Sequence, residues 1–266
     1  MSRLGWINEA DYSFACVLMF ERFQLDWMLG TEDPALRRAL GVALKRHPDV
    51  AWYCAHKCPE RAENVAALLA DAPEADEAAG RAAEIEALGA FDDFVIYTTP
   101  EKMAANCPFI YGWDKARLFE MADFAGKTVL DVGAGSGRLA FAAAEKAAWV
   151  YASEPVDTLR EFLRSEIARR GLGNMRVCDG MAHALPFPDD TFDIVMSGHV
   201  VGDFPDEETA ELARVAKKGG WLLDCPGDQP NDPGKNWALL DRGWEEMAYT
   251  GSFGYPVHRF RKLNDK

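Results

Sequence analysis

A glycine-rich segment near the middle of the chain follows an apolar run and could bind a ligand. It reads DVGAGSG over residues 131–137. Glycine accepts positive φ angles, and without a Cβ it lets a ligand approach main-chain N–H groups. Asp131 precedes the glycines, and a second carboxylate, Glu154, lies 21 residues after Gly133. A carboxylate only accepts hydrogen bonds and can take two hydroxyl donors at once, so these residues predict a ligand site.

Two phosphate-binding patterns agree less well with this segment. The dinucleotide fingerprint requires glycine at the sixth place, where this chain has Arg138. The phosphate loop requires a following Gly-Lys-Ser/Thr, which is absent. A site for nucleotide phosphates therefore remains the weaker alternative.

Strand-like and helix-like runs alternate after residue 124, and they must position the glycine segment. Apolar runs predict strands at residues 128–132, 150–153, 175–178, 192–197 and 221–225, with helices at 139–146, 157–170 and 206–217. Almost purely apolar strands separated by helices indicate a parallel sheet covered on both faces. Residues 236–244 predict a helix, and residues 246–250 and 255–263 a hairpin. We expect an α/β fold: a doubly wound, Rossmann-like, mostly parallel seven-stranded sheet with a C-terminal antiparallel hairpin.

The first part of the chain has a different pattern of apolar residues. Apolar residues recur there at spacings of three and four, as at positions 14, 17, 18, 20, 23 and 27, which is typical of amphipathic helices. We expect residues 1–105 to form a mainly helical cap that supplies substrate contacts, and residues 106–266 to form the ligand-binding domain. The alanine-rich, acidic stretch 72–90 predicts a solvated helix or a loose linker.

The motifs of residues 106–266 resemble those of the class I S-adenosylmethionine-dependent methyltransferases of the small-molecule type. The apolar strand, Asp131 and the three alternating glycines resemble motif I of that family. The resemblance implies that S-adenosylmethionine is the cofactor and that Glu154, which ends the second strand, accepts both ribose hydroxyls. The run DGMAHALPFPDDTFDIV at 179–195 is similar to the family's adenine-reading run, and residues 214–221 resemble its turn into the fifth strand.

The adenine-reading run departs from the family pattern at one position. Met181 stands where relatives often place an aspartate, and Asp179 lies two places earlier. Either Asp179 reaches the adenine amine, or that contact is lost and Met181 packs on the ring, with Ala182 supplying its backbone N–H. The full set of cofactor contacts that the resemblance implies is Tyr111, Asp131, Gly133, Ala134, Gly135, Gly137, Glu154, Pro155, Asp179, Gly180, Met181, Ala182 and Ser197.

The bound sulfonium would carry an activated methyl group, so the protein has mainly to align a nucleophile. His199 follows the fourth strand and is the candidate catalytic base for a hydroxyl or thiol acceptor, with Asp203, Tyr255 and His258 as weaker candidates. The structural alternative is that His199 only lines the cofactor site or caps the next helix. A non-catalytic module that binds the cofactor as a sensor or complex subunit is the second reading of the chain.

Two absent motifs and the overall charge indicate the chemical class of the methyl acceptor. The residues after the fourth strand read SGHV instead of the Asp/Asn-Pro-Pro-aromatic motif of amino-methylating nucleic-acid enzymes, and no Pro-Cys pair of the cytosine type occurs. The formal net charge is −14, whereas nucleic-acid binding depends on clustered Lys and Arg. We therefore expect a small-molecule acceptor and no nucleic-acid partner. The acceptor's identity and the atom methylated stay open.

Six cysteines occur without an export signal or an apolar run long enough to span a bilayer, so we expect reduced thiols, a cytoplasmic location and no membrane partner. Cys54 and Cys58 would share a helix face, and His47 and His56 lie close in sequence. The standard spacing of zinc ligands is absent, so we expect no metal. The oligomeric state stays open, with a homodimer as one option.

Overall fold

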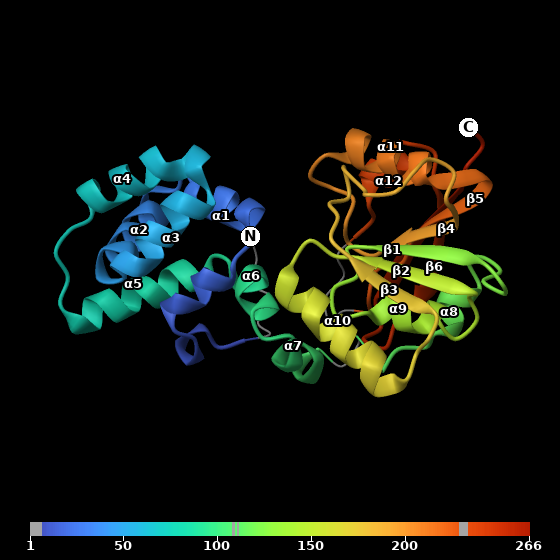
Figure 1. Cartoon of the computed structure of the whole chain (residues 1–266), viewed down its shortest axis with the longest axis horizontal. Coiled ribbons are helices and arrows are strands. Elements are labelled where there is room, and N and C mark those ends of the chain that lie inside the picture. Colours follow the sequence, from blue (N-terminus) through green and yellow to red (C-terminus); the bar gives the residue numbers. More distant parts are fainter. Residues whose placement is uncertain (1–6, 108–109, 111, 229–233) are drawn as a thin grey trace. The chain divides into compact units, whose positions relative to one another are not determined.

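The structure is a computed structural model that describes residues 7–107, 110, 112–228 and 234–266. The chain divides into two compact units, residues 1–106 and 107–266, and each is described here by itself. Figure 1 shows helices alone in the first unit and a sheet flanked by helices in the second. No helix among the described residues is long and apolar enough to cross a membrane.

The first unit is built from short helices whose starts are marked by capping residues. Asp33 and Asp76 each accept a main-chain N–H at the start of a long helix, and Pro34 takes the first helical position after Asp33. The elements are the 3₁₀ turns Glu9–Asp11, Phe14–Met19 and Pro59–Arg61 and the helices α1 (Arg22–Leu29), α2 (Pro34–Arg46), α3 (Pro48–Lys57), α4 (Ala62–Asp71), α5 (Glu77–Gly89), α6 (Asp92–Tyr97) and α7 (Pro100–Asn106).

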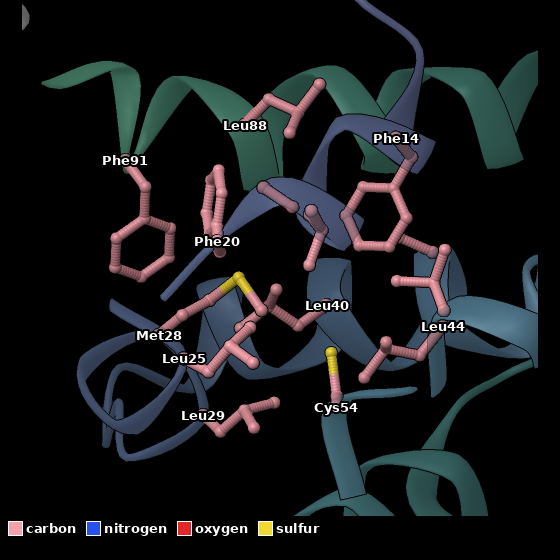
Figure 2. Packing of buried hydrophobic residues seen from close by; sticks show 14 of the residues in the cluster. Phe14, Phe20, Leu25, Met28, Leu29, Leu40, Leu44, Cys54, Leu88 and Phe91 are labelled. Carbon is pink, nitrogen blue, oxygen red and sulfur yellow. The ribbon is translucent and has the colours of Figure 1, made fainter. Parts of the chain in front are cut away.

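The hydrophobic core of this unit draws on most of its helices. Figure 2 shows Phe14 and Phe20 packed with Leu40 and Leu44 of α2 and with Leu88 of α5. The stretch 72–90 therefore contains a packed helix, α5, whose apolar face closes the core. The expectation of a helix there is correct, but neither a solvated helix nor a loose linker describes it, because Ala87 and Leu88 are buried in the core.

The second unit contains a seven-stranded sheet in the order β3-β2-β1-β4-β5-β7-β6. The first five strands in this order are parallel, and β7 and β6 are antiparallel, so the predicted sheet and hairpin are confirmed. The strands are β1 (Thr128–Val132), β2 (Trp149–Ser153), β3 (Met175–Cys178), β4 (Phe192–Ser197), β5 (Ala216–Asp224), β6 (Glu245–Thr250) and β7 (Pro256–Leu263). The helices are α8 (Ala116–Phe119), α9 (Arg138–Ala143), α10 (Asp157–Arg170), α11 (Pro205–Val215) and α12 (Trp237–Leu240).

Helices cover both faces of this sheet. Leu139 of α9 and Leu163 of α10 pack with one set of strand residues, and Leu212 of α11 and Leu239 of α12 pack with the set on the opposite face. The strand register aligns Val132 of β1 with Ser153, Ser197 and, through β4, Asp224. The carboxyl ends of four strands therefore meet along one edge, where open α/β sheets bind their ligands.

The two elements that differ most from their predicted bounds are β5 and α12. Strand β5 begins at Ala216, because Ala216 pairs with Phe192, and a register shift then brings Trp221 opposite Ile194. Gly219, with a φ of +76°, lies within the extra length. Helix α12 is much shorter than the predicted 236–244, since Gly243 turns the chain at a φ of +75°.

Candidate functional site

The glycine segment forms the turn between β1 and α9. Gly133, Gly135 and Gly137 all have positive φ angles, of 63°, 55° and 94°. A Cβ on Gly137 would lie 2.3 Å from a ring carbon of Phe141, whereas a Cβ on Gly135 would have nothing within 4 Å. Gly137 is therefore required for helix packing, and Gly135 faces space that a ligand could occupy.

Asp131 is buried beside this turn, with 1% of its surface exposed. Its Oδ2 atom is buried and has no hydrogen-bond partner among the described residues. Burial raises the pKa of Asp131 to about 7, and the charge of Arg138 acts in the opposite direction. A buried acceptor without a partner is costly, so this atom is a candidate contact for a ligand that donates a hydrogen bond.

Glu154 follows β2 and is turned toward the glycine turn, away from solvent, with 4% of its surface exposed. Its Oε2 accepts the N–H of Gly135 at 2.8 Å, and its Oε1 accepts the N–H of Val156 at 2.9 Å. Burial raises its pKa to about 7. Each carboxylate oxygen has two lone pairs, so both can accept a further donor from a ligand.

A third buried carboxylate lies at the same edge. Asp224 ends β5, is 1% exposed and accepts the Ser197 hydroxyl at 3.0 Å and the main-chain N–H of His199. Burial raises its pKa to about 6. Asp224 was not among the predicted site residues. The sequence feature that could have identified Asp224 is an acidic residue at the end of the apolar fifth strand. The other site residues lie at the same edge of the sheet.

His199 lies in the loop after β4, with a φ of +64°, which is uncommon for a residue other than glycine. Desolvation and, secondarily, the charge of Arg138 lower its pKa to about 4, although His199 is an exposed residue. The next residue, Val200, packs against the glycine turn. Its Cγ2 lies 2.6 Å from the position that a Cβ on Gly133 would take.

Arg138, at the start of α9, lies among these groups. It donates to the main-chain carbonyl of Cys225, and its guanidinium lies 4.8 Å from the centre of the Trp113 ring. The sequence singled out Arg138 only because it replaces a glycine of the dinucleotide fingerprint. In the structure its charge offsets part of the carboxylate charge of Asp131 and Asp224.

Arg160 holds the start of the predicted adenine-reading run, residues 179–195, next to Glu154. The Arg160 guanidinium donates to the Glu154 carbonyl at 2.9 Å and to the Asp179 carboxylate at 3.2 Å. The side chain of Asp179 is 74% exposed. Met181 is partly buried and pairs with Ala184 in an isolated bridge. Both alternatives for the adenine contact therefore stay predictions.

The other predicted contact residues fall into three groups. Ala134 is buried and donates its N–H to the Ser153 carbonyl at 3.1 Å. Pro155, Gly180 and Ala182 are partly buried along the same edge. Tyr111 lies outside the described residues.

The candidate zinc ligands are not brought together. Figure 2 shows the Cys54 sulfur inside the apolar cluster. His47 contacts Glu84 at 2.9 Å, and Nδ1 of His56 contacts the Trp52 carbonyl. Among the described residues, one other group could hold a metal: Asp26, Cys58 and Glu60, with ligand atoms within 4.8 Å of one another. Both acids are paired with arginines, namely Asp26 with Arg61 and Glu60 with Arg22.

The region of the chain that contains these site residues is similar to known proteins. Residues 130–224 match the family model described as "Methyltransferase domain". The matched residues, which include the glycine turn, Glu154 and Asp224, are thus similar to methyltransferase domains. It is 34% identical over 128 residues to the "Uncharacterized methyltransferase YcgJ" of Bacillus subtilis, covering 47% of this chain and 51% of that protein. It is 36% identical over 110 residues to the "Demethylmenaquinone methyltransferase" of Geobacillus kaustophilus, covering 40% of this chain and 47% of that protein.

Solved structures of methyltransferases have the same fold. A putative S-adenosylmethionine-dependent methyltransferase from Methanococcus maripaludis matches with a TM-score of 0.53 and 18% identity, covering 64% of this chain and 94% of that chain. A methyltransferase of this class from Aquifex aeolicus matches with a TM-score of 0.51 and 20% identity, covering 62% and 96%. The chain spans about half the length of the curated relatives above.

The residues present fit S-adenosylmethionine, the cofactor of this family. The unpartnered Oδ2 of Asp131 suits a hydrogen-bond donor such as the cofactor's ammonium group. The buried Glu154 carboxylate suits a pair of hydroxyls, and the space over Gly135 admits a ligand against the main chain. Three buried carboxyl groups along one edge also favour a cationic ligand over a phosphate.

Proposed function

We propose that this chain is an S-adenosylmethionine-dependent methyltransferase that transfers a methyl group to a small-molecule acceptor. When bound, the cofactor would supply a methyl group on a sulfonium, and in-line attack of the acceptor on the methyl carbon would release the neutral thioether. Asp131 and Glu154 would hold the amino-acid and ribose ends, and the protein would contribute orientation and exclusion of water.

One observation carries the proposal: the buried Asp131 carboxylate has an unpartnered oxygen beside the buried Glu154 and the open face of Gly135. A phosphate ligand would bring negative charge next to two buried acids. A ligand with an ammonium group, a sulfonium and two adjacent hydroxyls instead offers a donor or a positive charge to each of them.

The small-molecule acceptor is supported by two further observations. The names of relatives such as the Geobacillus kaustophilus protein specify demethylmenaquinone, a small molecule, as what those proteins methylate. The excess of 43 acidic over 29 basic side chains argues against a nucleic-acid acceptor.

The test is calorimetric titration with S-adenosylhomocysteine. Glu154→Ala is expected to weaken binding by about 2 kcal/mol, because two hydrogen bonds to a charged group are lost. Glu154→Gln should weaken binding less, since the amide keeps one acceptor. Glu161→Gln, the same change at an exposed position of α10, serves as the matched control and should bind like the parent protein.

Tighter binding of ATP or NADH than of S-adenosylhomocysteine would overturn the cofactor assignment. A screen of metabolite pools with methyl-labelled S-adenosylmethionine would then identify the acceptor. Tight cofactor binding without labelling of any metabolite would support the non-catalytic module instead.

A further inference from the structure

A polar pocket of about 210 Å³ lies in the second unit, beyond the carboxyl ends of β4 and β5. Its lining includes His199, Asp224, Lys235, Asn236, His258 and Phe260. It combines two imidazoles, a carboxyl group, an ammonium group and an amide with one aromatic ring. Polar groups that converge on a cavity can fix the orientation of a small molecule bound there.

The pocket adjoins the cofactor site through the loop after β4. His199 lines the pocket, and Val200, the next residue, packs on Gly133 of the glycine turn. Asp224, another lining residue, is hydrogen-bonded to Ser197 at the end of β4. The loop after β4 therefore contributes residues both to the pocket and to the contacts of the glycine turn.

His258, on β7, is held in one orientation by the neighbouring strand. Its Nδ1 contacts Oε1 of Glu246 on β6 at 2.5 Å, and Oε2 of Glu246 contacts the Lys235 ammonium at 2.7 Å. Lys235 first, and then His258, lower the pKa of Glu246, so this carboxylate stays ionised. An ionised acceptor at Nδ1 places the proton of neutral His258 there and leaves the lone pair on Nε2.

The remaining nitrogen is available for a ligand. Within the described part of the chain, Nε2 of His258 makes no hydrogen bond. His258 is one of the residues that line the pocket. His258 therefore has the arrangement in which a carboxylate orients an imidazole base and stabilises the imidazolium that forms.

We propose that this pocket binds the methyl acceptor by a hydroxyl group and that His258 is the general base that removes the hydroxyl proton, with Glu246 as its positioning residue. This inference rests on the proposed function. The acceptor O–H bond breaks as its proton passes to Nε2 of His258. The oxygen forms a new O–CH₃ bond as the S–CH₃ bond breaks, and the sulfonium becomes a neutral thioether. Glu246 balances the positive charge left on the imidazole ring.

A hydroxyl acceptor is favoured by the need for such a base. A neutral amine can attack a sulfonium methyl group before it loses a proton, and a thiol ionises readily near neutral pH. A hydroxyl is the acceptor that gains most from a positioned base. The charged or titratable groups around His258 are Glu246 on β6, Lys235 before α12, Asp224 on β5 and His199 after β4.

The experiment uses the whole chain saturated with S-adenosylhomocysteine, with 4-nitrophenol as a hydroxyl probe. At a pH below the pKa of the free dye, we expect the bound dye to show nitrophenolate absorption. His258→Gln and Glu246→Gln should each lower the ionised fraction, by about tenfold for each unit of pKa lost. His56→Gln, on an exposed histidine of the first unit, is the matched control and should leave it unchanged.

Two further measurements separate the possible failures. Calorimetry with S-adenosylhomocysteine reports folding and the cofactor site, and its affinity should be the same in all three variants. ¹⁵N NMR of the parent protein should show neutral His258 protonated at Nδ1, and Glu246→Gln should restore a tautomer mixture.

If S-adenosylhomocysteine does not bind the parent protein, the proposed function fails. If it binds but the dye does not bind, or the dye ionises equally in His258→Gln, the acceptor pocket or its base is overturned. A parent protein in which His258 is protonated at Nε2 would overturn the base assignment even if His258→Gln did not fold.

Discussion

At the scale of single residues, the site is defined by carboxyl groups whose burial opposes their ionisation. Asp131, Glu154 and Asp224 have pKa values raised to about 7, 7 and 6. Between the ordinary values near 4 and these raised values, the folded protein binds protons that the unfolded chain has released. The contribution of these groups to the free energy of unfolding therefore falls as pH rises from about 4 to about 7. A bound cationic ligand would stabilise the ionised carboxylates and so offset this decrease in the free energy of unfolding.

The same groups predict a pH dependence of binding. S-adenosylmethionine carries a sulfonium that S-adenosylhomocysteine lacks, so the ratio of their affinities should increase as pH rises through 6 to 7 and the carboxyl groups ionise. Calorimetry at constant ionic strength measures both affinities. Asp131→Asn removes one of the titrating groups and should flatten the trend, whereas a ratio that is independent of pH in the parent protein would contradict the electrostatic account.

At the scale of elements, the glycine turn combines a structural and a binding requirement. Gly135 and Gly137 both have positive φ, so replacing either with alanine costs about 1 to 2 kcal/mol of backbone strain. They differ in surroundings, because only a Cβ on Gly137 meets protein atoms.

Paired alanine variants at these glycines separate the two requirements. Gly137→Ala should lower the free energy of unfolding by more than the strain alone, since its Cβ would overlap Phe141 and Leu163. Gly135→Ala should lower stability only by the strain and should weaken binding of S-adenosylhomocysteine. Denaturant titration and calorimetry give the two quantities. Unchanged affinity in Gly135→Ala would mean that no ligand occupies the space over this residue.

Helix α5 illustrates how charge anchors an element of the first unit. Glu84 is buried, with 5% of its surface exposed, and contacts His47, Arg46 and Arg81 at 2.9, 3.2 and 2.8 Å. Desolvation raises its pKa, but hydrogen bonds, first from Arg81 and then from His47 and Arg46, outweigh it and leave the pKa lowered. The carboxylate thus stays ionised and ties α5 to α2.

Removal of the Glu84 charge should therefore destabilise the protein. We expect Glu84→Gln to lower the free energy of unfolding by about 2 kcal/mol, because hydrogen bonds to a charged group are weakened. The effect should disappear at a pH low enough to protonate Glu84 in the parent protein. Glu86→Gln, on the exposed side of the same helix, should change stability little. Equal effects of the two substitutions in denaturant titrations would show that the buried network adds nothing.

At the scale of the whole molecule, the two units have separate hydrophobic cores. The core of the first unit draws on residues between 7 and 95, and the two clusters of the second on residues between 113 and 260. Every contact described for the cofactor site and for the pocket beside His258 comes from the second unit. The role of the first unit as a cap that contacts the substrate stays a prediction.

Separate cores predict separable functions. A fragment of residues 107–266 should fold and bind S-adenosylhomocysteine with the affinity of the full chain, as expected for a domain with its own core. If the first unit contacts the acceptor, the fragment should lose methyl transfer but keep cofactor binding. Circular dichroism and calorimetry test the first expectation. A fragment that is folded but does not bind would show that the cofactor site needs residues from the first unit.

The sequence by itself determined the sheet and the cofactor turn. Apolar strands alternating with helical runs specify a parallel sheet covered on both faces. Asp131 and the three glycines lie within seven consecutive residues, so local spacing was sufficient to recognise them. Glu154 could be identified for the same reason, since it directly follows an apolar strand. The limits of β5 and α12 were misplaced, because strand pairing with a register shift sets the start of β5 and the turn at Gly243 limits α12.

Only the tertiary structure decided which side chains share the pocket beside the cofactor site. His258, Glu246, Lys235 and Asp224 come from two antiparallel strands, a loop and the end of a parallel strand. Their contacts depend on the register of β7 against β5 and β6, and a shift of one residue would turn His258 to the other face of the sheet. No local pattern encodes that register, so the sequence alone could not place His258 beside Glu246.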